Sequence, residues 1–147
     1  MVAYSFQKRF IDPVVAGLEP GPLVPGMKRQ TIRAPRKRHA RPGEVIQLYA
    51  AMRTKHCRRI GSPTCTAVQR VRLLLPSPSQ AARLILYSAT APTWIEMADA
   101  TELDIFARWD GFHDFDDMAA FWRDNHPGVT EFAGVLVRWQ PAQEPLR

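Results

Sequence analysis

The sequence has few cysteines and no long hydrophobic run, and each shortage excludes a class of protein. Only two of its 147 residues are cysteines, Cys57 and Cys65, and they do not form a CxxC pair. A disulfide scaffold is therefore disfavoured. No stretch approaches the roughly 18 consecutive apolar residues of a membrane span, and the first ten residues lack the basic-then-apolar order of a secretory signal. We therefore expect a cytoplasmic protein with no membrane association.

Common catalytic and nucleotide-binding motifs are also missing. The chain contains no P-loop, GxGxxG, GxSxG or HExxH sequence. Zinc ligands usually occur in pairs about two to four residues apart, whereas the closest histidine and cysteine here, His56 and Cys57, are adjacent. Adjacent residues on a strand point to opposite faces. We therefore expect no metal ion and no other cofactor.

Acidic residues are scarce in the middle of the chain, and basic residues are scarce in its C-terminal part. Residues 28–83 contain 14 Lys and Arg and a single acid, Glu44, whereas residues 96–147 contain 11 acids and four arginines. A folded domain with this asymmetry has a strong positive field over one region, which attracts polyanions such as nucleic acid. The alternative is a solvated basic face that binds no ligand.

What is present is the composition of an ordinary globular domain. A chain of 147 residues predicts a single domain, residues 1–147, which can bury a core without a disulfide or a metal. Thirteen prolines and eight glycines indicate many turns and short elements. Strands, or shorter edge pieces, are expected over residues 3–6, 28–33, 44–50, 64–75, 83–88, 93–97 and 132–139.

Capping signals predict short helices between and after these strands. Asp12, followed by proline, is expected to start one helix. Thr101, with Asp104 in the capping-box position, and Asp114 are expected to start two more between residues 100 and 125. The order of elements shows no regular strand–helix alternation. It predicts an α+β fold, a small mixed β-barrel of five or six strands with short helices packed on it.

Several segments resemble the ASCH domain family, a branch of the PUA-like β-barrel superfamily that is linked with RNA. The strongest is Gly-x-Lys-x-x-Thr-Ile-Arg at residues 26–33. The turn and strand at residues 42–49, the stretch FARWDGF at 106–112 and the last strand at 132–139 resemble further family landmarks, in the same order. A proline-rich insertion before the signature and the basic loop of residues 36–41 are longer than in the smallest relatives.

The signature offers one possible catalytic set. A Lys28 amine with a lowered pKa could take the proton of the Thr31 hydroxyl, provided that Lys28 lies in the loop before the strand. Alternatively, Lys28 and Arg33 bind phosphate and Thr31 is an ordinary strand residue. The resemblance implies the first interpretation, because small family members that hydrolyse N4-acetylcytidine use this Lys and Thr with a Glu on a later helix. Asp110 matches that Glu and is one methylene shorter.

A second possible set is Tyr49, Arg53 and Lys55. A phenol and an ammonium beside a phosphodiester could move a proton at the 2′-hydroxyl and stabilise the charged transition state, so RNA would be cut without metal and DNA spared. The spacing of Tyr49 and Lys55 resembles that of bacterial ASCH ribonucleases. The alternative is a tyrosine at the end of a strand beside a solvated run of charge.

These observations predict an RNA-binding protein that takes single-stranded RNA or a flipped nucleotide, with no obligatory protein partner. Metal-independent ribonuclease activity, N4-acetylcytidine amidohydrolase activity and RNA binding without catalysis remain open. The expected pocket is lined by Lys28, Thr31, Arg33, Tyr49, Lys55 and Asp110. The residues expected to contact nucleic acid, with the tryptophan as a stacking surface, are Arg29, Arg33, Arg36, Lys37, Arg38, Arg53, Arg58 and Trp109.

Overall fold

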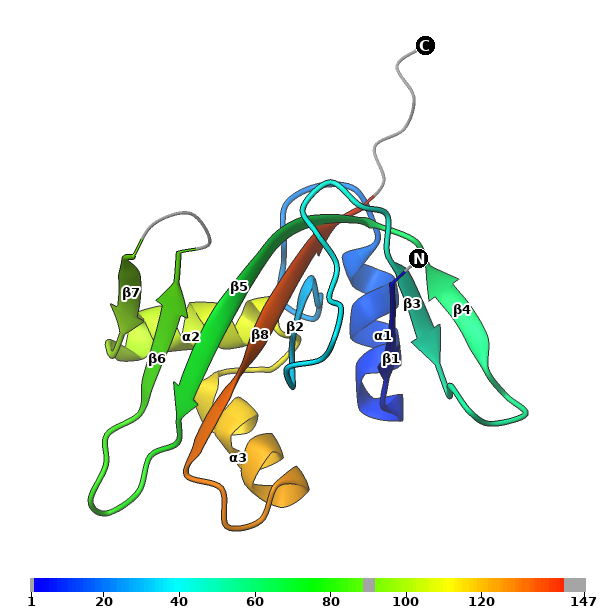
Figure 1. Ribbon diagram of the computed structural model, residues 1–147. Coiled ribbons are helices and arrows are strands. Elements are labelled where there is room, and N and C mark those ends of the chain that lie inside the picture. The colour runs from blue at the N-terminus through cyan, green and yellow to red at the C-terminus, as the bar shows by residue number, and fades with distance from the viewer. Residues whose placement is uncertain (1, 89–91, 142–147) are drawn as a thin grey trace.

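The computed structural model describes residues 2–88 and 92–141, and this part of the chain forms three helices and eight strands in two sheets (Figure 1). The elements are β1 (Ala3–Phe6), α1 (Lys8–Gly17), β2 (Gln30–Arg33), β3 (Gln47–Ala50), β4 (Arg58–Gly61), β5 (Thr64–Leu74), β6 (Arg83–Tyr87), β7 (Trp94–Met97), α2 (Ala100–Trp109), α3 (Phe115–Asn125) and β8 (Glu131–Gln140). The predicted α+β class is confirmed. The predicted five or six strands are too few, because β4 lies outside the expected strand ranges and the segments at 83–88 and 93–97 both form strands.

The strands form two open sheets, and the described residues contain no closed barrel. The three-stranded sheet has the order β1-β3-β4 and the five-stranded sheet the order β2-β8-β5-β6-β7. The sheets are linked on one side, where the Ile46 amide donates to the Pro63 carbonyl at 2.9 Å. On the other side β1 and β2 are both edge strands. There the Arg33 guanidinium donates to the Ser5 carbonyl at 2.6 Å, in the place of a strand N–H.

Strand register sets which residues share a face. β1 pairs with β3 in parallel, and β3 pairs with β4 antiparallel. The five-stranded sheet is antiparallel throughout, and its longest ladder joins β5 to β8 from Thr64 opposite Gln140 to Leu74 opposite Glu131. Because successive residues of a strand point to opposite faces, Arg70 of β5 lies on the face opposite to that of Val71.

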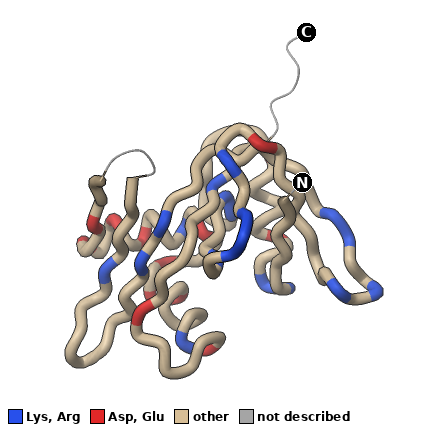
Figure 2. The backbone as a smooth tube through the Cα atoms, in the orientation of Figure 1, with Lys and Arg blue, Asp and Glu red and all other residues tan. Residues whose placement is uncertain are grey.

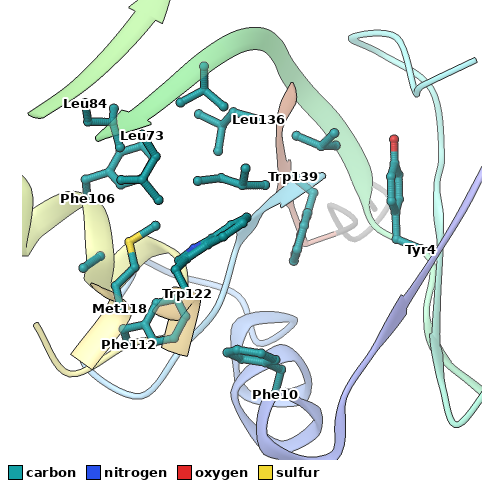
Figure 3. Close-up of a cluster of buried hydrophobic side chains, with 14 of the residues drawn as sticks. Tyr4, Phe10, Leu73, Leu84, Phe106, Phe112, Met118, Trp122, Leu136 and Trp139 are labelled. Atoms are coloured by element: carbon teal, nitrogen blue, oxygen red, sulfur yellow. The ribbon is translucent and has the colours of Figure 1, made fainter. Parts of the chain in front are cut away.

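Helices α2 and α3 pack against one face of the five-stranded sheet. On α2, buried Leu103, Phe106 and Ala107 are three and four residues apart, which places them on one side of the helix. In Figure 3 leucines of the sheet face aromatic and methionine side chains of the two helices: Leu73, Leu84, Leu136, Phe106, Met118 and Trp122. The other face of β5, β6 and β7 is not covered by a helix (Figure 1).

Two helix starts differ from prediction. Helix α1 begins at Lys8, so Asp12 and Pro13 lie inside it, because burial of Phe10 and Val14 one turn apart outweighs the cost of an internal proline. Helix α2 is capped by Asp99, which accepts from the Thr101 amide at 2.8 Å. Asp104 instead accepts from the Phe115 amide at 2.9 Å and ties α2 to α3.

The third predicted helix start is correct, since Asp114 caps α3 and accepts from the Asp117 amide at 2.8 Å. Each helix has 10 or 11 residues. In the part of the chain that the structure describes, no helix has the length and apolar character needed to cross a membrane.

Candidate functional site

A cavity of about 260 Å³ lies where the two sheets fail to meet. Edge strands β1 and β2 contribute Ser5, Phe6, Thr31 and Arg33 to its wall, and the segments around α1, α2 and α3 contribute the rest. The volume is just below the roughly 300–1,000 Å³ of pockets for drug-sized ligands. A cavity of this size suits a small planar group such as a nucleobase.

Lys28 is fixed between the ends of α1 and α2. It precedes β2, as the amidohydrolase interpretation requires, and its amide donates to the Pro13 carbonyl at 2.9 Å. A Cβ on Gly17 would lie 2.3 Å from the Lys28 carbonyl oxygen. A Cβ on Gly111, which has a φ of +86°, would lie 2.9 Å from the Lys28 Cβ. Both glycines therefore allow the close approach of Lys28.

The Lys28 ammonium is buried among aromatic rings beside a carboxylate. The residue is 2% exposed, and its Nζ lies 4.7 Å from the ring centre of Phe10, 5.8 Å from Phe6 and 5.9 Å from Phe112. Nζ donates to the Asp110 carbonyl oxygen at 2.7 Å and lies 3.3 Å from Asp110 Oδ1. Burial lowers the pKa of Lys28 from 10.5 to about 8, although Asp110 acts to raise it. A larger share of this amine is therefore neutral near neutral pH than for a lysine in water.

Asp110 ends α2 and is itself 4% exposed. Among the residues that the structure describes, its buried Oδ1 has no geometrically satisfactory hydrogen bond, and Lys28 Nζ approaches it at 3.3 Å as an ion pair. Burial raises the pKa of Asp110, while the charges of Lys28 and Arg33 act to lower it. A carboxyl with a raised pKa and an amine with a lowered pKa in one buried contact are typical of functional sites.

Arg33 prepares the hydroxyl of Thr31. Its Nε donates to Thr31 Oγ at 3.0 Å, and its guanidinium lies 4.9 Å from the ring centre of Phe6. A hydroxyl that accepts a hydrogen bond keeps its own O–H available as a donor. A neighbouring cation also stabilises the alkoxide form of that hydroxyl. Thr31 is therefore placed as a potential nucleophile.

Much of the cavity lining is aromatic. His126 stacks on Trp122 with ring centres 4.7 Å apart, and Phe132 lies 4.5 Å from Trp122. All three side chains line the cavity, as does Phe121. An aromatic lining with a few polar groups is the usual design of a site for a planar organic ligand.

Two predicted pocket residues lie elsewhere. Tyr49 is on β3, and its hydroxyl donates to Gln47 Oε1 at 3.0 Å. Lys55 is exposed in the turn between β3 and β4, beside exposed Arg53 and close to exposed Arg58 at the start of β4. Neither Tyr49 nor Lys55 lines the cavity. The prediction of one shared pocket is therefore wrong for these two residues, because β3 and β4 belong to the other sheet and lead away from β2.

The predicted nucleic-acid contacts also separate. Arg36, Lys37 and Arg38 are exposed in the basic loop after β2, where the Arg36 guanidinium lies 4.5 Å from the ring centre of Tyr4 and Arg38 pairs with Glu44 at 2.7 Å. Figure 2 shows this loop and the β3–β4 hairpin as basic segments. The basic loop therefore remains available to a polyanion.

The prediction that Arg29 contacts nucleic acid is wrong, because this residue is 4% exposed and holds the loop after α1. Its guanidinium donates to the carbonyls of Gly17, Glu19 and Gly21 at 2.7–2.8 Å. These bonds use its donors for the fold rather than for a phosphate. Trp109 is half-buried, lies outside the cavity and has the Arg138 guanidinium 5.4 Å from one ring centre.

Sequence reasoning missed the aromatic surroundings of Lys28. Phe6 and Phe10 are four residues apart across the end of β1 and the start of α1, and Phe112 follows Gly111. The only available signal was Phe112 in the FARWDGF stretch, and phenylalanine in such a position is also typical of core packing.

Among residues 2–88 and 92–141, no group of three or more His, Cys, Asp or Glu side chains is placed to hold a metal ion. Comparisons of the chain with protein-family models, with curated proteins and with solved structures find no match. The chemistry of the site is therefore inferred from its residues and their geometry.

Proposed function

We propose that the cavity is the active site of an amidohydrolase that removes an acyl group from the exocyclic nitrogen of a pyrimidine, as in N4-acetylcytidine. One observation carries this proposal: Lys28 and Asp110, 82 positions apart, meet in the same cavity as Thr31 and Arg33. This is the set that the ASCH resemblance implies for deacetylation. The ribonuclease set is not gathered in that cavity.

The first half of the reaction transfers the acetyl group to the enzyme. Neutral Lys28 Nζ takes the proton of Thr31, directly or through one water, as Thr31 Oγ attacks the acetyl carbonyl carbon. The carbonyl oxygen becomes an oxyanion beside the Arg33 guanidinium. The C–N4 bond then breaks and N4 takes the proton from Lys28. Cytidine leaves, and the acetyl group remains on the enzyme as an ester of Thr31.

The second half restores the enzyme. Lys28 accepts a proton from a water molecule that attacks the ester, and Thr31 regains its proton as acetate leaves. Substrate and water thus give cytidine and acetic acid, which ionises. Asp110 does not touch the acyl group in this scheme. It is a positioning residue that holds Lys28 through its carbonyl oxygen.

Release of cytidine from N4-acetylcytidine, followed by chromatography, tests the proposal. Thr31→Val should lower the rate at least about a hundredfold, because it removes the hydroxyl and keeps the branched shape. The matched control is Thr66→Val, since Thr66 is exposed on β5 and lies outside this cavity. A wild-type protein that releases no cytidine from this nucleoside contradicts the proposal.

A second function is favoured by the exposed basic loop. We propose that the protein binds single-stranded RNA there, and that the two open sheets are a variant of the PUA-like barrel opened between β1 and β2. Metal-free cleavage by Tyr49 and Lys55 is a further candidate, tested by incubating labelled RNA with EDTA and the Tyr49→Phe or Lys55→Ala variant. The control is Lys8→Ala, an exposed lysine of α1. RNA that stays intact with the wild type excludes cleavage.

A further inference from the structure

A continuous row of side chains leads from the cavity across the five-stranded sheet. Arg33 lines the cavity and lies opposite Val135, which in turn lies opposite Arg70. The Arg70 guanidinium lies 5.0 Å from the ring centre of Tyr87, and Tyr87 is paired with Trp94. The row crosses β2, β8, β5, β6 and β7 in order. Four strand spacings give it a length of about 19 Å.

The outer end of the row is an exposed aromatic surface. Trp94 is 63% exposed, which is unusual for a tryptophan. It also borders a second cavity, of about 400 Å³, together with Val68 and Gln69 of β5 and Leu86 of β6. The ladder between β5 and β6 starts at Val71 opposite Leu86, so this hollow lies where the two strands have separated.

The two faces of the sheet differ in charge. The helical face carries most of the acids of the C-terminal part of the chain, on α2 and α3 and at their caps: Asp99, Glu102, Asp104, Asp114, Asp116, Asp117 and Asp124. The open face has exposed Arg70. The basic loop lies beside β2 (Figure 2). Arg72 and Arg83 on the open face are paired with Glu131 and Glu96.

We propose that a single strand of RNA lies along this row, with one nucleotide in the cavity and a base further along the strand stacked on Trp94. Arg70 contacts a backbone phosphate of the nucleotides between them. Exposed aromatic rings that alternate with cations are the usual platform for single-stranded nucleic acid. The proposal rests on the amidohydrolase function and specifies its substrate: an acylated cytidine within an RNA strand rather than the free nucleoside.

The test compares a single-stranded RNA of twelve nucleotides, carrying one central N4-acetylcytidine, with the free nucleoside. We expect the wild type to prefer the oligonucleotide, measured as the ratio of the two kcat/KM values. Trp94→Ala should lower this ratio and the RNA affinity about tenfold, because it removes the stacking surface. Ile105→Ala is the control, since Ile105 is 49% exposed on α2, on the other side of the sheet.

A second variant pair separates charge from shape. Arg70→Ala should reduce the slope of log affinity against log salt by about 0.7, the value for one phosphate contact on a single strand. Arg70→Lys should retain that slope. A Trp94→Ala variant that keeps both the ratio and the affinity overturns the proposal. So does a wild type that is a dimer in light scattering and becomes a monomer on Trp94→Ala, because the patch would then join two copies of the chain.

Failure of the substrate proposal can be distinguished from failure of the proposed function. Turnover of the free nucleoside without a preference for the oligonucleotide retains the amidohydrolase and overturns the RNA row. Binding of RNA that depends on Trp94, without deacetylation of either substrate, overturns the amidohydrolase and with it the assigned substrate. Loss of folded structure in Trp94→Ala is detected by circular dichroism, and Trp94→Phe, which keeps an aromatic face, should then restore affinity.

Discussion

Lys28 and the basic loop carry the same charge close together in the chain, yet they occupy opposite environments. Lys28 is 2% exposed, surrounded by Phe6, Phe10 and Phe112, and paired with Asp110. The loop cations at positions 36–38 are exposed. The difference teaches that the cations of residues 28–83 are of two kinds: a buried amine whose pKa is lowered and exposed side chains that remain in water.

Burial accounts for the lowered pKa of the Lys28 amine. Moving an ammonium out of water disfavours its charged form. Three aromatic rings and one carboxylate offset part of the free-energy cost of burying the ammonium. The pKa of Lys28 still falls to about 8. The loop cations keep their hydration, so the RNA binding proposed for them would act at long range and weaken as salt is added.

The largest expected effect in this comparison is on catalysis. Lys28→Met should lower the deacetylation rate about a thousandfold, because it removes the base and keeps the length of the side chain. Lys8→Met, at an exposed position of α1, is the control. For the wild type, kcat/KM should rise with pH through about 8, where half of Lys28 is neutral, and level off above it. A rate that is independent of pH from 6 to 9 would contradict Lys28 as the base.

The next effect is on stability. The folded pKa of Lys28 is about 8 and its unfolded value is 10.5, so between these values the unfolded chain binds a proton that the folded chain has released. The free energy of unfolding should therefore rise with pH in that window, by on the order of 3 kcal/mol, and stay flat with respect to Lys28 below pH 8.

Denaturant unfolding of the wild type and of Lys28→Met at pH 8 and pH 10 isolates this contribution, because other titrating groups are common to both proteins. The difference between the two proteins should move in favour of the wild type as the pH rises. A difference that does not change between the two pH values would mean that the Lys28 amine is hydrated in solution rather than buried.

The fold was predictable from sequence where local chemistry decides it. The alternation of apolar and polar residues predicted the ends of β5 and β8 to within one residue. The prediction that Asp114 caps a helix was also correct. The start of α1 was not predictable from its proline, because tertiary burial of Phe10 and Val14 overrides local preference. Barrel closure depends on long-range pairing between β1 and β2, and no local pattern reports that pairing.

The candidate site was predictable in part for the same reason. Lys28, Thr31 and Arg33 are close in sequence, and their link to Asp110 came from family resemblance rather than from periodicity. The basic charge around them and the resemblance of their spacing to that of ASCH ribonucleases suggested the same pocket for Tyr49 and Lys55, whereas strand order places Tyr49 on the other sheet and Lys55 in a turn of that sheet. Arg29 was predicted to contact RNA only because it is an arginine. Its three carbonyl partners, at the end of α1 and in the loop after it, could not be predicted, because no sequence pattern defines the path of that loop.

A smaller effect is expected from the basic loop. Changing Arg36, Lys37 and Arg38 together to Ala should weaken binding of single-stranded RNA about tenfold at 0.1 M salt and lower the salt slope by about 0.7 for each phosphate that is no longer neutralised. The control removes the same charge elsewhere, in Lys8→Ala, Arg108→Ala and Arg123→Ala combined. Fluorescence anisotropy over a salt series measures both. Equal weakening in the two triple variants would show that net charge alone attracts the RNA.

The smallest effect is expected from an exposed ion pair, which tests whether burial is what distinguishes Lys28. Arg83 Nη1 lies 2.9 Å from Glu96 Oε1, and the two side chains are 45% and 40% exposed. Water and salt screen such a pair, and holding both side chains costs conformational entropy. A double-mutant cycle of Arg83→Ala and Glu96→Ala should therefore give a coupling energy of less than about 1 kcal/mol that disappears in 1 M salt. A coupling energy above that value would mean that the open face of the sheet excludes water, and that the contrast between buried and exposed cations is smaller than their accessibility indicates.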